Sequence, residues 1–200
     1  MHPRVCRFIS DAVYDGRLEA EQGNERRALV LGAGAQPLLR PAGIVHAAIE
    51  HAGCSQSSEP GAVLAAEIYA SALRQHRTDK EGVEHPKTAA NILVVAPYNV
   101  QVNLLKRKLP ADARVGTVDK FQGQEAELVI VSMTTSSEQD LPRHLEFLYS
   151  KNRLNVAVSR AKCLAIVIAN PALTAIKCHT PGQMALVNTL CWVAEAGRLQ

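Results

Sequence analysis

The chain has 200 residues, 47% of them hydrophobic, which predicts one folded domain with a sizeable core. Its 22 basic and 19 acidic side chains give a formal net charge of +3, which permits a nucleic-acid partner without demanding one. No apolar run approaches the roughly 20 residues of a membrane span, and the amino terminus lacks the pattern of a signal peptide. We therefore expect a cytoplasmic protein with no membrane partner.

The cysteines and histidines have none of the spacings typical of a metal site. The five cysteines are odd in number and include no CxxC pair, so neither a zinc site nor a disulfide framework is indicated. The scattered residues are Cys6, Cys54, Cys163, Cys178 and Cys191, and His2, His46, His51, His76, His85, His144 and His179. We expect a reducing compartment and no metal held by this chain.

The first part of the chain predicts a turn at residues 1–3 that runs into a short helix, followed by a loop over residues 29–43. Gly32 and Gly34 in that loop resemble the start of a dinucleotide fingerprint. Pro37 occupies the place of the third glycine, however, so the fingerprint is not assigned.

The next segments predict a strand over residues 44–50 and a helix over residues 59–76, capped by Ser57 or Ser58. The helix is indicated by apolar residues that recur at helical spacing. The polar segment 77–87 predicts a surface loop.

From residue 91 onward, strands alternate with helices. Residues 91–97 form an apolar run typical of a strand buried on both faces of a parallel sheet, and a helix is predicted over residues 99–109. Further strands are predicted at residues 114–118, 128–133 and 163–169, and further helices at 154–161 and 184–196. This alternation predicts an α/β fold whose parallel sheet is covered on both faces.

Three polar segments adjoin these strands and carry the candidate functional residues. Ligands of open parallel sheets bind outside the carboxyl ends of the strands, so the residues next to each apolar run are the most informative. In the first segment, residues 96–101, Pro97 and Tyr98 follow a strand. The Tyr98 ring can cap the core or stack on an unpaired base, and the residues alone leave both roles open.

The second segment, residues 115–125, contains more polar residues than packing requires. Gly123 allows the backbone to approach a ligand closely. The side chains of Gln122, Gln124 and Glu125 offer amides and a carboxylate to ribose hydroxyls or to an arginine. An ordinary solvated turn remains the alternative.

The third segment, residues 153–162, is predicted as a helix that leads into a strand. Arg153 and Arg160 are seven residues apart, about two helical turns, so both are expected on one face. Two guanidinium groups over a crevice can bind phosphate oxygens, because the planar fork binds them bidentately. The alternative is two solvated side chains.

The order of these segments resembles the C-terminal motor domain of superfamily 1B DNA/RNA helicases, the group that contains the nonsense-mediated-decay helicase and the replication helicase-nucleases. Residues 96–101 resemble motif IV, residues 115–125 motif V and residues 153–162 motif VI. Residues 1–3 resemble the end of the Tyr-Arg-Met-His-Pro segment. The likeness covers nearly the whole chain and is greatest to bacterial helicases fused to RecB-like nucleases. It implies a RecA-like three-layer fold.

In such helicases ATP and its Mg²⁺ lie between two RecA-like domains. The resemblance implies that Arg160 is the arginine finger of this domain, supported by Arg153. The implied nucleotide contacts are Gln122, Gly123, Gln124 and Glu125. The implied contacts to single-stranded DNA or RNA are Pro97, Tyr98 and Thr117.

The sequence departs from the family by lacking the G-x-x-x-x-G-K-[ST] phosphate loop and a recognisable carboxylate pair. The P-loop domain, which would hold the metal, is therefore an expected partner. The tyrosine and arginine expected before Met1 are also absent, so we expect a truncated gene product, part of a split gene or an excised domain.

The expected organisation is a lead-in over residues 1–43, a RecA-like domain over residues 44–180 and an amphipathic helix over residues 181–200. The expected function is that of a helicase motor domain that is inactive alone. The alternatives are a non-catalytic nucleic-acid-binding module, an inactive helicase fragment, and a small-molecule enzyme on a doubly wound fold, for which no nucleophile and base pair stands out.

Overall fold

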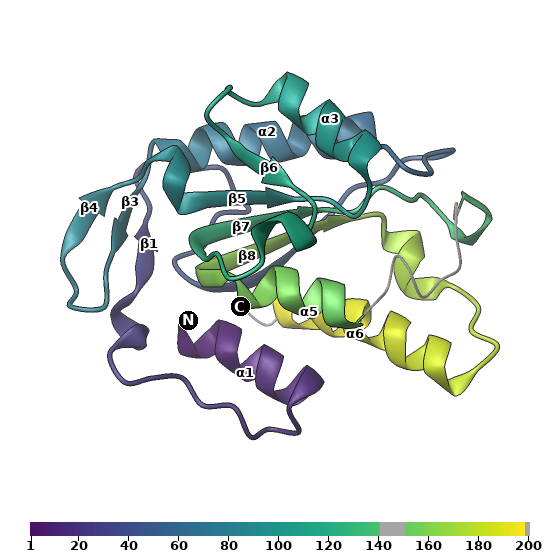
Figure 1. Ribbon diagram of the computed structural model, residues 1–200, viewed down its shortest axis with the longest axis horizontal. Helices are drawn as coiled ribbons and strands as arrows, with labels where there is room; N and C mark the ends of the chain where they lie inside the picture. The colour runs from purple at the N-terminus through teal and green to yellow at the C-terminus, as the bar shows by residue number, and fades with distance from the viewer. Residues whose placement is uncertain (141–150, 199–200) are drawn as a thin grey trace.

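Five parallel strands form the central sheet of the computed structural model, which describes residues 1–140 and 151–198 (Figure 1). In spatial order they are β2 (Gly43–Ala48), β8 (Ala161–Ala169), β7 (Ala126–Ser132), β5 (Ile92–Val95) and β6 (Arg114–Gly116). Each strand runs parallel to its neighbours. This is the RecA-like α/β arrangement that the sequence predicts.

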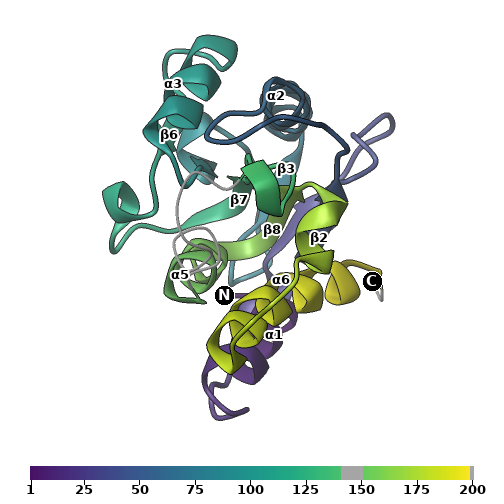
Figure 2. The ribbon, with the colours of Figure 1, turned by 90° about the vertical axis from the view of Figure 1, so that its right-hand side faces the viewer.

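Helices cover both faces of the sheet (Figures 1 and 2). One face carries α2 (Glu59–Leu73) and α3 (Asn99–Lys108), and the other carries α1 (Pro3–Val13), α5 (Lys151–Ser159) and α6 (Pro181–Arg198). The short 3₁₀ helices are η1 (Asn24–Arg26), η2 (Ala89–Asn91), η3 (Asp119–Phe121), η4 (Glu138–Asp140) and η5 (Pro171–Ala175). Within the described part of the chain, none of the helices combines the length and apolar character that crossing a membrane requires.

Each central strand contributes side chains to two separate cores, because successive residues of a strand point to opposite faces. In β5, Leu93 and Val95 pack in the core beneath α1, α5 and α6. Ile92 and Val94 pack in the core beneath α2 and α3. All four side chains are fully buried, which explains why the strand is continuously apolar in sequence.

The predicted loop at residues 77–87 is wrong, because part of it forms a β-hairpin. A second, antiparallel sheet consists of β1 (Ala28–Val30), β3 (His76–Thr78) and β4 (Glu84–Pro86). The Asp79 carboxylate closes the hairpin turn by accepting hydrogen bonds from the backbone N–H groups of Glu81 at 3.0 Å and Val83 at 2.8 Å. The predicted loop at residues 29–43 likewise begins inside β1, whose three residues were too few to show a pattern.

The amino end of α2 is fixed by Gln101, a fully buried side chain of α3. Ser58 caps α2 by accepting a hydrogen bond from the Gly61 N–H, as predicted. The Gln101 amide accepts from the Ser58 N–H at 2.9 Å, donates to the Ser58 carbonyl at 3.2 Å and donates to the Ser132 hydroxyl at 3.0 Å. One amide therefore joins α2, α3 and the end of β7.

Replacing Gln101 by leucine is expected to lower the free energy of unfolding by about 3 kcal/mol, because the buried polar groups of Ser58 and Ser132 lose their partner. Chemical denaturation of the 200-residue chain measures the change. Asn103→Leu is the matched control, since Asn103 lies on the exposed face of the same helix and its loss should change stability by less than about 0.5 kcal/mol. Equal effects of the two variants would contradict the role given to Gln101.

Helices α1 and α6 pack on the central sheet rather than standing apart from it. Val5 and Ile9 of α1 belong to the same buried core as Val193 of α6. The last turn of α6 fits closely against β2, where a Cβ added to Gly197 would lie 2.7 Å from the backbone nitrogen of His46. The predicted division at residues 43 and 180 stays a prediction.

Candidate nucleotide and nucleic-acid site

The predicted site residues lie at the two opposite ends of the parallel strands, which we call the amino edge and the carboxyl edge of the central sheet. Pro97 and Thr117 follow the carboxyl ends of β5 and β6, whereas residues 122–125 precede β7 and Arg160 precedes β8. The expectation that the polar segments belong to the carboxyl ends therefore fails for residues 122–125 of the second segment and for Arg160 of the third. The reason is topological: between parallel strands, each connection must return to the amino edge.

The connection from β6 to β7 carries the second polar segment from one edge of the sheet to the other. It passes beneath β5 through η3, where the Phe121 ring is only 3% exposed and packs in the same core as Leu93 and Val95. Lys120 and Arg114 place their cationic groups 5.7 and 6.0 Å from the centre of this ring. Phe121 thus anchors the middle of the crossing segment.

Residues 122–125 are exposed as the segment reaches the amino edge. Gly123 has a φ of 74°, a left-handed conformation that favours glycine, and no atom lies within 4 Å of the place where a Cβ would stand. The Glu125 carboxylate lies 3.8 Å from the Lys162 ammonium, and both groups are substantially solvated. The tract therefore presents backbone and side-chain polar groups to solvent with few internal partners.

Arg160 lies directly beneath this exposed tract. Its residue is 8% exposed, and its Nη1 donates to the Gln124 carbonyl at 3.1 Å. Within the described residues, its buried Nε has no hydrogen-bond partner. Burial lowers the pKa of Arg160, whereas the nearby Glu125 carboxylate acts to raise it. The guanidinium thus retains an unused donor beside a polar, solvent-facing loop.

The predicted helix contains Arg153 but ends just before Arg160. Helix α5 ends at Ser159, so Arg160 lies in the turn that joins it to β8, with its carbonyl accepting from the Ala126 N–H at 3.0 Å. Whether the two side chains share a face stays a prediction. Arg153 lies in the first half of α5, and its side chain is outside the described residues.

The candidate nucleic-acid contacts surround the carboxyl edge. The Tyr98 side chain is 6% exposed, packs in the core with Phe121 and occupies the N-cap position of α3. The ring caps the core in this structure, and stacking on a base would require it to turn outward. Pro97 and Thr117 are half-buried and remain within reach of solvent.

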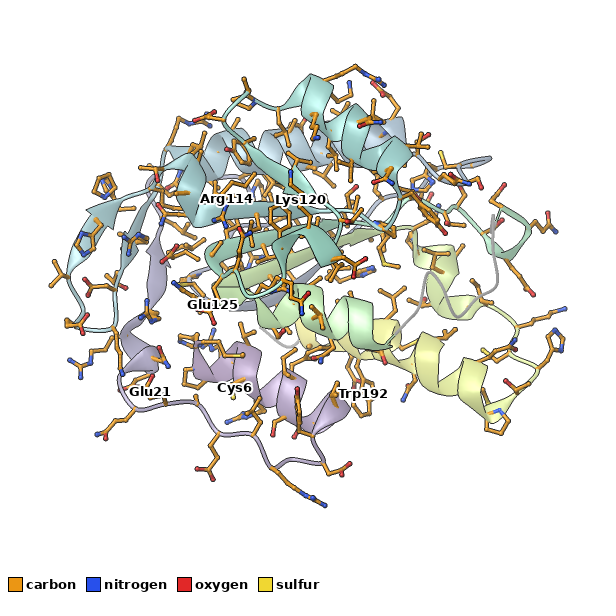
Figure 3. All side chains as sticks on the ribbon, in the orientation of Figure 1. Cys6, Glu21, Arg114, Lys120, Glu125 and Trp192 are labelled. Atoms are coloured by element: carbon orange, nitrogen blue, oxygen red, sulfur yellow. The ribbon has the colours of Figure 1, made fainter. Side chains whose placement is uncertain are left out.

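Sequence analysis missed Arg114, which contacts the predicted nucleotide tract. Its Nη2 donates to the Gln124 Oε1 at 2.6 Å, and its Nη1 donates to the Ala90 carbonyl. Figure 3 labels Arg114, Lys120 and Glu125, which come from consecutive segments of this region. An arginine at the start of a three-residue strand carries no recognisable motif, so only the fold reveals its partner.

A buried charged cluster near the amino ends of β5 and β7 was also missed. The Glu127 carboxylate accepts from the Asn91 Nδ2 at 2.9 Å and lies 3.7 Å from the Arg77 Nη1. Lys87 is 6% exposed, and among the described residues its Nζ has no hydrogen-bond partner. Burial lowers the pKa of Lys87 to about 8 and raises the pKa of the neighbouring Cys163 to about 12. Arg77 thus pairs with Glu127, while the buried Lys87 ammonium lies nearby without an ion pair among the described residues.

Metal ligands do not gather in the part of the chain that the structure describes, where no group of three or more histidine, cysteine, aspartate or glutamate side chains could hold an ion.

Comparison with known proteins adds a family to this geometry. Residues 1–172 match the model of the AAA_12 family, described as an AAA domain. DNA-binding protein SMUBP-2 of Rattus norvegicus is 29% identical over 202 residues, covering 95% of this chain and 18% of that protein. SMUBP-2 of Mesocricetus auratus is 32% identical over 186 residues, covering 85% and 17%. The human RNA helicase Mov10l1 is 41% identical over 91 residues, covering 42% and 8%.

The chain spans less than a fifth of the length of these relatives. The family model, in contrast, covers all the segments that hold the candidate site, from α1 to η5. The parallel sheet and the order of the motifs agree with that match. The chain belongs to the AAA_12 family of AAA domains and is a domain of the superfamily 1 helicase type.

Proposed function

We propose that this chain is the C-terminal motor domain of an ATP-dependent DNA or RNA helicase and that it supplies the arginine finger to an ATP site completed by a P-loop domain. The observation that carries the proposal is Arg160, which is buried beneath the exposed tract 122–125 and whose Nε has no hydrogen-bond partner among the described residues. The proposal includes a cytoplasmic location and a bacterial parent helicase that is fused to a RecB-like nuclease.

The residues at the amino edge fit one side of a nucleotide. Gly123 exposes its backbone, Gln122 and Gln124 offer amides, and Glu125 offers a carboxylate suited to ribose hydroxyls. The sequence has no phosphate loop to cradle the opposite side. The fit therefore supports a shared site, with Mg²⁺ held by the P-loop domain.

In the shared site, ATP supplies a phosphoryl group whose transfer to water releases the free energy for movement. Arg160 turns its guanidinium from the Gln124 carbonyl toward the interdomain face, where its charge and planar donors stabilise the negative charge that develops during transfer. Arg153 supports this role, either by binding a phosphate group or by coupling the ATP site to the residues that contact the single strand. Domain closure brings Arg160 into position, and opening releases it.

Single-stranded nucleic acid is bound at the opposite, carboxyl edge. Pro97, Tyr98 and Thr117 contact its backbone and bases there, and such contacts carry little sequence information. The names of the relatives include both a DNA-binding protein and an RNA helicase, so the proposal covers both nucleic acids. The mildly basic charge of the chain is compatible with either.

The purified 200-residue chain is expected to hydrolyse no ATP above the buffer rate, with or without single-stranded DNA, because it lacks the phosphate loop. The same chain joined to the P-loop motor domain of a related helicase is expected to show hydrolysis stimulated by single strands. A coupled-enzyme phosphate assay measures both. Turnover by the isolated chain that survives repurification would overturn the shared-site account.

A non-catalytic nucleic-acid-binding module or an inactive helicase fragment is the alternative. Such a module would bind single strands tightly without a second domain. A titration of the isolated chain with labelled single-stranded DNA at several salt concentrations separates the two, since a dedicated binder keeps a strong, salt-dependent affinity.

A further inference from the structure

Two arginines from different elements converge on Gln124. Arg160 donates from Nη1 to the backbone carbonyl of Gln124 at 3.1 Å. Arg114 donates from Nη2 to the side-chain Oε1 of the same residue at 2.6 Å. Gln124 therefore lies between a guanidinium of β6 and the guanidinium proposed as the finger.

Arg114 is itself held in place from two further directions. Its Nη1 donates to the Ala90 carbonyl at the end of the connection into β5, and its Cζ lies 6.0 Å from the centre of the Phe121 ring. Ala90 belongs to η2, and Phe121 is buried in the core. Arg114 is thus tied to the rigid part of the domain, while its remaining donor reaches the exposed tract.

The tract around Gln124 has few other constraints. Gly123 has a left-handed φ of 74° with open space around its Cα, and Gln124 is exposed. The backbone N–H of Gln124 donates to the Phe121 carbonyl at 3.0 Å, which anchors the start of the turn. The position of the Gln124 carbonyl is then set by contacts with side chains. Arg160 contacts that carbonyl, and Arg114 holds the side chain of the same residue.

We propose that Arg114 is a positioning residue for Arg160 and acts through Gln124, an inference that rests on the finger role proposed above. Arg114 fixes the Gln124 side chain, the Gln124 carbonyl fixes the Arg160 guanidinium, and the finger is held ready beside the tract. When Arg114 is lost, the tract shifts and Arg160 is misplaced.

The first test measures ATP turnover in the protein joined to its P-loop domain. Arg114→Ala is expected to lower kcat about ten- to a hundred-fold with little change in KM, since a misplacement of about 1 Å can cost a hundred-fold. Gln124→Ala is expected to lower kcat by a similar factor, and its KM for ATP should also rise because it removes a proposed nucleotide contact. The double variant should be no worse than either single variant, because both remove the same link. Gln124→Glu should turn over ATP faster than Gln124→Ala, since a carboxylate accepts the Arg114 hydrogen bond at least as well as the amide does.

Arg107→Ala is the matched control, because Arg107 is an exposed arginine of the neighbouring helix α3. It is expected to leave kcat unchanged. Unchanged kcat in Arg114→Ala, or additive losses in the double variant, would overturn the positioning role. An equal loss of turnover in Arg114→Ala and Arg107→Ala would overturn it as well, since the loss of one positive charge would then explain the effect.

The second test needs no activity and uses the 200-residue chain itself. The ¹⁵N spectrum of arginine side chains reports how freely each guanidinium rotates, and the Arg160 signal is assigned from its absence in Arg160→Ala. Arg114→Ala and Gln124→Ala are expected to lose the slowly rotating Arg160 signal, and Arg107→Ala is expected to keep it. An unchanged Arg160 signal in Arg114→Ala sinks the inference even if the finger role holds, whereas a loss of that signal with no effect of Arg160→Ala on turnover sinks only the proposed function.

Discussion

Arg160→Ala is expected to reduce nucleic-acid-stimulated ATP hydrolysis by about 10³- to 10⁵-fold when the chain is joined to a P-loop domain. The guanidinium would supply positive charge at the transferring phosphoryl group, and alanine supplies none. Arg160→Lys should recover only part of the loss, because an ammonium keeps the charge but not the planar pair of donors. A steady-state assay at saturating ATP measures the change in kcat.

The control for this variant must separate catalysis from folding, since Arg160 is buried and bonded to Gln124. Thermal unfolding of the variant should show a folded domain under the assay conditions. Arg17→Ala removes an exposed arginine far from the tract and should leave turnover unchanged. Normal turnover in folded Arg160→Ala would remove the finger role from this residue.

Lys87→Met is expected to stabilise the folded chain at pH 7 by up to about 3 kcal/mol. Burial lowers the pKa of Lys87 from 10.5 to about 8, so folding at pH 7 keeps an ammonium charged where its charge is disfavoured. Methionine has a similar length and leaves Glu127 paired with Arg77 and Asn91. Chemical denaturation at pH 7 measures the gain, and Lys106→Met, at an exposed position of α3, is the control.

The same group gives the wild-type chain a characteristic pH dependence. Below about pH 8, Lys87 is protonated in both states; from about pH 8 to 10.5 the unfolded chain keeps a proton that the folded chain has lost, so the free energy of unfolding rises with pH. Cys163 acts in the opposite direction from about pH 9 to 12, because its folded thiol keeps a proton that the unfolded thiol loses. The rise should therefore be clearest between pH 8 and 9 and should disappear in Lys87→Met. A wild-type stability that is flat or falling in that window would contradict it.

The fold could be predicted from sequence where burial alone decides the structure. Strands such as β5 and β7 are covered on both faces, so each appears as an unbroken apolar run. The β3–β4 hairpin could not be predicted in this way, because it is held by backbone pairing and by the Asp79 carboxylate rather than by an apolar face. Its strands are short and mostly polar, so they resemble a loop.

The candidate site was predicted only as far as local segments reveal it. Gly123 and Arg160 belong to motifs that can be recognised in sequence. The fold brings residues 122–125 into contact with Arg160, which donates a hydrogen bond to the Gln124 carbonyl. Arg114 and Lys87 act through partners on other elements, and no local pattern marks them. For Tyr98 the sequence left two roles open, capping the core and stacking on a base, and the fold buries its ring in the core.

The close fit of α6 against β2 also bears on how an edge strand of the sheet is protected from pairing with another chain. The exposed backbone of an edge strand is a template for pairing with another chain. Ile49 donates its N–H to Ala169 of β8, so by the alternation of a strand the N–H of His46 faces the outer side, where Gly197 leaves no room for a further strand. The opposite edge, β6, is only three residues long. One lateral side of the sheet is therefore covered by α6, and the other offers a second molecule only a three-residue strand that begins with the charged residue Arg114.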